Sequence, residues 1–445
     1  MTFTVEPPIS AVLTAAAHRV REQLGDRAGL LVEQALLRTL TDTITAPGDG
    51  TAFVITGDIP AMWLRDSTTQ MLPYLRFVGE SPELAELLAA VVRRQLRCIV
   101  HDPYANSFNL TGNGAHHDDR DLCEDPLVWE QKYEVDSLAY PVVLTHRLLR
   151  LAGSEELRRG VLDDTAHRAL RTVVAHWRLE TDHEARSTYR FVRDIGIPTE
   201  TLERDGRGTP VGVTGMTWSG FRPSDDACTY GYNVPANLLA AQALLAVADL
   251  AREGFADEDL AADADSLREQ LLEGVRRHGV LEESGRTIYA YEVDGLGGTL
   301  VMDDANMPSL LSLPLDAASV HDPAITAATR DLVLSERNPF YFSGTVAAGV
   351  GSPHTLPEHV WPIAFAVEGL TGTRERALEI LDLLLRTDAG TDRMHESFHV
   401  DDPTSFSRPW FSWADSMLCE LALHLVDGPH PALAAERAVS EARTA

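Results

Sequence analysis

The stretch SPELAELLAAV, residues 81–91, contains in one place the pattern that decides the fold. Ser81 is a favoured N-cap residue, Pro82 suits the first helical position, and Glu83 places a negative charge at the positive end of a helix. The leucines and the valine that follow recur at intervals of three and four residues. That spacing places them on one face of an α-helix. Residues 81–91 therefore predict the start of an amphipathic helix.

Comparable helical patterns cover most of the chain, with short turns on one side and long polar loops on the other. They do not repeat a sequence motif, which argues against a solenoid. Strand patterns are few, and the clearest are residues 188–192 and 287–293. We therefore predict an all-α fold of stacked helical hairpins. Further helices are expected near residues 9–24, 28–44, 66–78, 134–152, 156–179, 234–252, 258–278, 323–335, 357–370, 373–387 and 410–426.

The length and composition favour one large domain. The chain has 445 residues, of which 44% are hydrophobic, so it can bury a large core. No Ser/Gly-rich linker or abrupt change of composition divides it. We predict a single catalytic domain over residues 1–445. Residues 428–445 are rich in Ala, Glu and Arg, and we expect them to be a capping helix or a frayed tail.

The net charge limits the partners. With 38 basic and 67 acidic residues the formal charge is −29, a field that repels nucleic acid and anionic membranes. No uncharged apolar run of about 18 residues is apparent, so we expect no membrane span. The N-terminus lacks a signal-peptide pattern, and a cytoplasmic location is the default expectation. The cysteines are too dispersed to suggest a disulfide framework or a zinc site; they are Cys98, Cys123, Cys228 and Cys419.

The polar loops carry most of the tryptophans. A core tryptophan normally lies among aliphatic residues, whereas here only Trp177 does so. An indole face stacks on the C–H side of a pyranose, while carboxylates and guanidinium groups bind its hydroxyls. The pattern therefore favours sugar recognition. The tryptophans in or beside polar loops are Trp63, Trp129, Trp218, Trp361, Trp410 and Trp413.

Two carboxylate loops suggest the chemistry. The stretch WSGFRPSDD, residues 218–226, ends in adjacent Asp225 and Asp226 shortly before a helical pattern. The second loop, residues 394–398, holds Glu396 beside a histidine and a phenylalanine. Two carboxylates on separate loops are the minimum equipment of a glycoside hydrolase.

Other polar motifs also lead into predicted helices. Residues 57–67 and 129–137 combine acids with Arg65 and Lys132, either to grip sugar hydroxyls or to cap and salt-bridge a helix start. Residues 303–308 and 351–362 also contain polar side chains that either bind the sugar or have a structural role such as helix capping. The predicted substrate-binding residues are Asp58, Trp63, Arg65, Asp66, Lys132, Glu134, Asp136, Trp218, Arg222, Asp226, Asp304, Asn306, His354, Trp361, His395 and Trp410.

No metal or other cofactor is predicted. The segment HHDDRD, residues 116–121, has ligand-type side chains, but consecutive residues diverge and seldom form a metal site. Neither an HExxH motif nor EF-hand spacing is present. We expect a polar loop at the mouth of the site, whose role remains open.

Four motifs together resemble glycoside hydrolase family 125. They are GDIPAMWLRDS (57–67), WEQKYEVDS (129–137), GFRPSDDA (220–227) and HESF (395–398). The resemblance implies an (α/α)6 barrel whose long loops form the active-site face. It implies an exo-acting α-1,6-mannosidase that inverts configuration without a metal ion. It also places the general base at Glu396 and the general acid in the Asp225–Asp226 pair, where Asp225 is preferred and Asp226 is the alternative.

Several alternatives stay open. Another inverting (α/α)6 glycosidase, such as an α-glucosidase or trehalase type, would use the same acid and base. A calcium-dependent α-mannosidase would be sensitive to chelation. A terpene cyclase would need DDxxD spacing on a helix, which neither Asp225–Asp226 nor Asp118–Asp119 has. A non-catalytic sugar-binding protein would tolerate loss of Glu396. The expected partner is an α-mannoside oligosaccharide or glycan, with no nucleic acid and no membrane, and the oligomeric state is left open.

Overall fold

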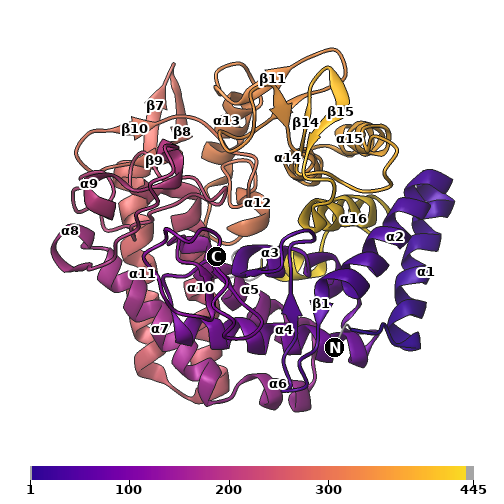
Figure 1. The fold of residues 1–445 in the computed structure, drawn as a ribbon, viewed down its shortest axis with the longest axis horizontal. Helices are drawn as coiled ribbons and strands as arrows, with labels where there is room; N and C mark the ends of the chain where they lie inside the picture. Colours follow the sequence, from indigo (N-terminus) through magenta and orange to yellow (C-terminus); the bar gives the residue numbers. More distant parts are fainter. Residues whose placement is uncertain (1–2, 437–445) are drawn as a thin grey trace.

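Helices alternate along the chain between an inner and an outer ring (Figure 1). The structure is a computed structural model and describes residues 3–436. In this range six inner helices surround the centre: α3 (Leu64–Thr69), α5 (Val135–Ala152), α10 (Val234–Leu250), α12 (Leu313–Asp316), α14 (Pro362–Leu370) and α16 (Ser412–Asp427). The outer helices that alternate with them are α2 (Asp26–Thr43), α4 (Pro82–His101), α7 (Asp164–Glu180), α11 (Glu258–Gly274), α13 (Pro323–Val333) and α15 (Arg374–Arg386). This is the predicted (α/α)6 barrel.

The residue patterns explain which ring each helix joins. Every residue of α10 except Asp249 is buried, because an inner helix has protein on all sides. Helix α4 buries its leucine face, leaves Glu83 half-buried and exposes Glu86, which is the pattern of an outer helix. Helix α1 (Pro7–Leu24) stands outside the alternation and packs on α2 and α16.

Helix α10 also explains an apolar segment that could be mistaken for a membrane span. Residues Val234–Phe255 are long and apolar enough to cross a bilayer by length and composition. However, 94% of the apolar window is buried inside the protein, as expected for a core helix.

Most predicted helix boundaries are confirmed, and the exceptions have local causes. Ser81 caps α4, since its Oγ accepts the Leu84 N–H at 3.2 Å. The predicted helix 156–179 is two helices, because Asp163 caps a new helix at Thr165 and Ala166. Three further predictions need correction. Residues 66–78 contain α3 and a separate 3₁₀ helix, residues 357–361 precede α14, and residues 188–192 form no strand.

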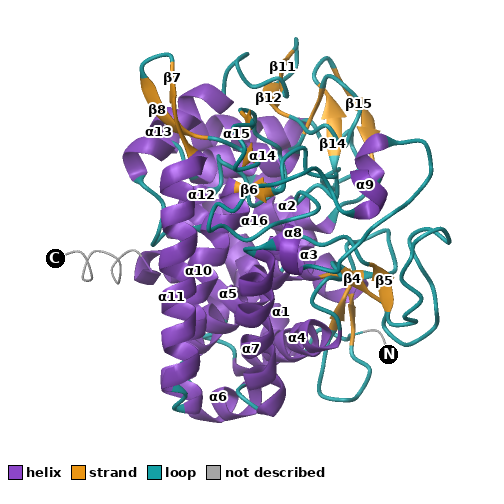
Figure 2. Cartoon of the chain, turned by 90° about the vertical axis from the view of Figure 1, so that its left-hand side faces the viewer, coloured by secondary structure: helices purple, strands orange, loops and turns teal. Residues whose placement is uncertain are grey.

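Short strands hold the loops in front of the inner helices (Figure 2). Strand β3 (Met62–Trp63) runs directly into α3, β6 (Tyr232–Asn233) into α10, and β13 (His359–Val360) lies one residue before α14. Strands β3, β4 (Ser107–Phe108) and β5 (Val128–Glu130) form one sheet. The other sheets are β6 with β9 (Glu292–Val293) and β10 (Thr299–Leu300), and β13 with β14 (Ser397–His399) and β15 (Asp402–Ser407).

The remaining elements are short or peripheral. The helical ones are η1 (Leu72–Phe77), α6 (Glu155–Val161), α8 (His183–Arg186), η2 (Pro198–Glu200), α9 (Glu203–Gly206), η3 (Ala251–Phe255) and η4 (Val275–Gly279). Three two-stranded hairpins complete the set: β1 (Ile44–Thr45) with β2 (Phe53–Val54), β7 (Val280–Glu283) with β8 (Arg286–Tyr289), and β11 (Tyr341–Ser343) with β12 (Ala348–Val350).

The described part of the C-terminal tail packs against the barrel. Buried apolar residues from Ile9 to Leu433 form one continuous cluster. Residues 431–436 are helical, and Glu436 accepts two hydrogen bonds from Arg147 of α5, at 2.7 and 2.9 Å. The rest of the predicted cap, residues 437–445, lies outside the described residues.

Candidate active site

The loops before the inner helices converge on one cavity of about 330 Å³. Each inner helix points its N-terminus toward this side, so each hairpin contributes part of the wall. The positive ends of the helix dipoles favour the carboxylates gathered there. The cavity is lined by Thr56, Ile59, Trp63, Arg65, Asp66, His117, Glu130, Lys132, Glu200, Pro223, Ser224, Asp225, Asn306, His354, Trp361, Glu396, Arg408, Phe411 and Trp413.

A tight turn directs Asp225 into the cavity. Phe221 pairs with Ala227 across the turn, and the Asp225 N–H donates to the Arg222 carbonyl at 2.9 Å. Asp225 adopts a left-handed conformation, with φ 68°, which aspartate tolerates better than most residues. Its side chain is 22% exposed, whereas that of the adjacent Asp226 is 1% exposed. Of the two predicted acids, only Asp225 lines the cavity.

Arg65 contacts four carboxyl groups, that of Asp225 and three others. Its guanidinium lies 3.1 Å from Asp225 Oδ1 and 2.7 Å from Glu134 Oε2. Asp66 and Asp136 approach the same group at 3.3 and 3.4 Å. Since one positive charge cannot balance four negative ones in a buried place, part of the cluster retains protons.

Burial has the largest single effect on the pKa values of these carboxyl groups. It raises the pKa of Asp66 to about 6 and that of Asp136 to about 6, against the opposing effect of Arg65. Burial also raises the pKa of Glu134 well above its usual value, with Asp225 adding to the effect. Burial acts in the same direction on Asp225, but Arg65 and a hydrogen bond from Glu134 outweigh it and lower its pKa.

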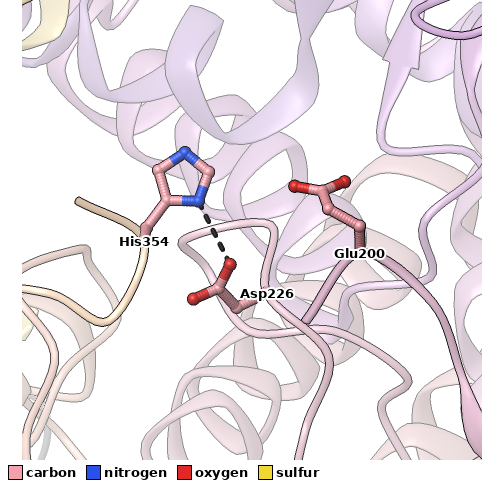
Figure 3. A group of neighbouring side chains, drawn as sticks. All are labelled: Glu200, Asp226 and His354. Atoms are coloured by element: carbon pink, nitrogen blue, oxygen red, sulfur yellow. Dashed lines mark hydrogen bonds and ion pairs between the residues drawn. The ribbon is translucent and has the colours of Figure 1, made fainter. Parts of the chain in front are cut away.

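Asp226 does not line the cavity, and it contacts His354, which does. His354 Nδ1 lies 3.2 Å from Asp226 Oδ1. The dashed line in Figure 3 marks this contact. Burial lowers the pKa of His354, but the hydrogen bond and charge of Asp226, with Glu396 and Asp225, raise it overall to about 9. His354 is therefore a cation near neutral pH, placed close to the carboxylates of Asp225 and Glu396.

Glu200, Asp226 and His354 form a group of side chains of the kinds that can bind a metal ion. Ligand atoms of Glu200, Asp226 and His354 lie within 4.8 Å of one another (Figure 3). Cationic side chains of the protein already balance these acids. Glu200 Oε2 lies 2.8 Å from Lys132 Nζ and 2.8 Å from Arg193 Nη1. Asp226 pairs with His354. The group is better described as an ion-pair network than as a cation site.

Glu396 lies in a loop, one residue before β14, and lines the cavity. Ser407 Oγ donates to Glu396 Oε2 at 2.8 Å, and the Ser397 hydroxyl lies 2.7 Å from Ser407 Oγ. Arg408 Nη1 is 3.6 Å from the other carboxylate oxygen. A hydroxyl and a guanidinium thus fix the orientation of this carboxylate in the cavity.

Aromatic side chains form further parts of the cavity wall. Trp63, Trp361, Trp413 and Phe411 all lie at the cavity. Trp361 is fixed by its indole N–H, which donates to Thr355 Oγ1 at 3.0 Å.

Two predicted sugar-binding tryptophans lie elsewhere. Trp218 is 1% exposed and stacks on His183 with ring centroids 3.6 Å apart, so its face is already covered. Trp410 donates its indole N–H to Asp415 at 2.9 Å. We correct both assignments: these side chains pack the walls and do not line the cavity.

Other predicted ligands also support the cavity from behind. Asp58 pairs with Arg408, Arg222 with Glu292 at 2.5 Å, and Asp304 accepts the Ser224 hydroxyl at 2.8 Å. His395 stacks on Phe406, with centroids 3.7 Å apart. Glu134 and Asp136 are buried around Arg65. The predicted residues that line the cavity are Trp63, Arg65, Asp66, Lys132, Asp225, Asn306, His354, Trp361 and Glu396.

Several lining residues were not predicted from the sequence. Glu200 lies in none of the motifs, and Glu130 lies in the motif 129–137 but was not singled out as a ligand. Arg193 contacts both carboxylates, at 2.7 Å from Glu130 and 2.8 Å from Glu200. Arg408 lies in the aromatic stretch before α16, where its position beside Trp410 was a usable signal. His117 belongs to the polar loop expected at the mouth, and it does line the cavity.

A protein-family model described as metal-independent alpha-mannosidase (GH125) matches residues 26–423. The match runs from the start of α2 into α16, and so spans all twelve helices of the two rings among the described residues. The chain belongs to this family. It is therefore a glycoside hydrolase of the metal-independent α-mannosidases.

Individual relatives agree with this assignment. A metal-independent α-mannosidase of Streptococcus pneumoniae, in a non-productive complex with α-1,6-mannobiose, is 42% identical, with a TM-score of 0.90 over 96% of this chain and 100% of that one. The meiotically up-regulated gene 157 protein of Schizosaccharomyces pombe is 36% identical over 92% of this chain and 85% of its own length. A glucoamylase from Saccharomycopsis fibuligera, 13% identical with a TM-score of 0.55 over 90% of this chain and 96% of its own, shares the fold alone.

Proposed function

We propose that this α-mannosidase removes terminal α-1,6-linked mannose from oligosaccharides or glycans, acts from the chain end and inverts the anomeric configuration. The observation that carries the proposal is the meeting of Asp225 and Glu396 in one cavity from different hairpins. The solved relative that holds α-1,6-mannobiose supports the choice of linkage.

The proposed mechanism assigns one role to each carboxyl group. Asp225 donates a proton to the glycosidic oxygen as the bond to the anomeric carbon breaks. Glu396 accepts a proton from the water that attacks the opposite face of the sugar. Lys132, Arg65 and His354 present donors to the sugar hydroxyls, and the aromatic wall packs against its apolar faces.

The deciding experiment is hydrolysis followed by NMR in the presence of EDTA. We expect α-1,6-mannobiose to release β-mannose first, while α-1,2- and α-1,3-mannobiose react far more slowly. Glu396→Ala should abolish the reaction. No cleavage of any mannobiose would sink the proposal and favour the α-glucosidase or trehalase type, and α-mannose as first product would make Glu396 a nucleophile.

We also propose a cytoplasmic location, without nucleic-acid or membrane partners. Its support is the strongly negative net charge together with four free thiols, which persist in a reducing compartment. Fractionation of cells that produce the tagged full-length protein tests this, and recovery in a secreted or membrane fraction would refute it.

A further inference from the structure

Glu134 lies directly behind the proposed acid and does not line the cavity. Its side chain is fully buried, at 0% exposure, between Arg65 and the turn that holds Asp225. Arg65 and Asn106 each contact both carboxyl groups: Arg65 at 2.7 Å from Glu134 and 3.1 Å from Asp225, and Asn106 at 3.4 and 3.5 Å. The two carboxyls also hydrogen-bond to each other. A hydrogen bond between two carboxyl groups requires a proton on one of them.

The surroundings favour that proton being on Glu134 in the free enzyme. Glu134 is enclosed, whereas Asp225 reaches solvent in the cavity and faces the cations Arg65, Lys132 and His354. The opposed pKa directions of the pair, raised for Glu134 and lowered for Asp225, agree with this geometry. The titratable and charged groups that face Glu134 are Arg65, Asp136, Tyr189, Asp225 and Cys228.

We propose that Glu134 is a positioning residue that stores the proton which Asp225 delivers to the leaving oxygen. This inference rests on the proposed function, since it needs Asp225 as the acid.

The proton balance is simple. The Glu134 O–H bond breaks as Asp225 gains the proton, and Asp225 then transfers it to the glycosidic oxygen as the C–O bond breaks. The attacking water gives its proton to Glu396 while its oxygen bonds to the anomeric carbon. After release of the products, Glu396 loses its proton to solvent and the Asp225–Glu134 pair regains one, which restores the starting state.

The first test compares two substrates that differ in their need for an acid. Glu134→Gln keeps the size of the protonated side chain but cannot give up a proton. We expect kcat/KM to fall by about 10²–10⁴-fold on α-1,6-mannobiose, the range of general acid catalysis, and by less than about tenfold on α-mannosyl fluoride, whose leaving group needs little protonation. An equal loss on both substrates would overturn the proposal.

The matched control is Asp136→Asn. Asp136 is an equally buried acid that also contacts Arg65, at 3.4 Å, but among the described residues it forms no hydrogen bond with Asp225. Any loss in this variant should be similar for the two substrates. If the wild-type enzyme cleaves neither, the proposed function itself has failed, and this result is distinct from a failure of the Glu134 inference.

A second variant keeps the test independent of whether Glu134→Gln folds. Ser137 Oγ donates to Glu134 Oε2 at 2.9 Å and does not contact Asp225. Ser137→Ala removes a hydrogen bond that favours ionised Glu134, so the pair should hold its proton more tightly. The alkaline limb of kcat/KM on mannobiose should then move up by about one pH unit, and an unmoved limb would contradict the proposal.

Discussion

Asp225 and Asp226 are neighbours in the chain, but their carboxyl groups lie on different sides of one turn. Asp225 opens into the cavity beside Arg65, and Asp226 is buried against His354 at 3.2 Å. The adjacent acids are therefore not interchangeable. One is placed to meet substrate, and the other sets the charge of a histidine.

This division leads to opposite expectations for two isosteric substitutions. Asp225→Asn should lower kcat/KM on α-1,6-mannobiose by about 10²–10⁴-fold, because the amide cannot act as an acid. Asp226→Asn should cost about tenfold or less, through a weaker hold on His354. Steady-state kinetics on folded variants would measure both, and the reverse order of losses would move the acid to Asp226.

The His354–Asp226 pair predicts a pH-dependent stability. The pKa of His354 is about 9 in the folded protein and about 6.5 when unfolded, so its contribution is complete below the lower value and disappears as pH rises through the higher one. The stability difference between the wild type and His354→Gln should therefore shrink between roughly pH 6.5 and 9.5. Urea unfolding across this range measures it, and a constant difference would contradict the assignment.

Asp58 should act through Arg408 and not through direct contact with sugar. Asp58 pairs with the guanidinium of Arg408, which lies 3.6 Å from Glu396. The same guanidinium donates to Thr56 Oγ1 at 3.0 Å. Asp58→Asn should lower kcat by up to about tenfold by loosening Arg408. Because the two side chains act together, adding Asp58→Asn to Arg408→Lys should cause little further loss. Fully additive losses would show that Asp58 acts independently.

The tail should stabilise the barrel through one ion pair. Arg147 and Glu436 are both largely buried, at 8 and 9% side-chain exposure, and form two hydrogen bonds. Glu436→Ala leaves a buried cation without this partner and should cost roughly 3 kcal/mol of unfolding free energy. Arg147→Met in the same chain should recover much of the loss. Denaturant unfolding measures both variants, and no loss in the single variant would mean that the tail does not cap the barrel.

Local patterns predicted the helices well because caps and spacing act within a few residues. Ser81 and Leu84 fix the start of α4, as expected. The start of α14 was predicted too early, at residue 357, whereas the helix begins with a proline at its first position. Pro362 takes that place, and it forces Trp361 into an extended conformation.

Site residues were harder to predict where their roles depend on distant partners. Trp218 lies beside polar residues in sequence, yet His183 covers it in the fold. Glu200 has no motif, and Lys132 and Arg193 bring it to the cavity. The loops of Asp225 and Glu396 were singled out by their residue types, but the separate roles of acid and base came only from the family resemblance, since nothing local links two loops about 170 residues apart in the chain.

The arrangement of the cavity wall has a consequence for how the enzyme comes into being. Every inner helix brings one segment of wall, and the last segment, residues 394–413, carries Glu396 and Arg408. A nascent chain that has emerged only as far as α15 can bury much of its core but lacks Glu396, the proposed base. Turnover therefore begins only when α16 joins α3 and closes the circle, so catalytic activity reports completion of the whole barrel.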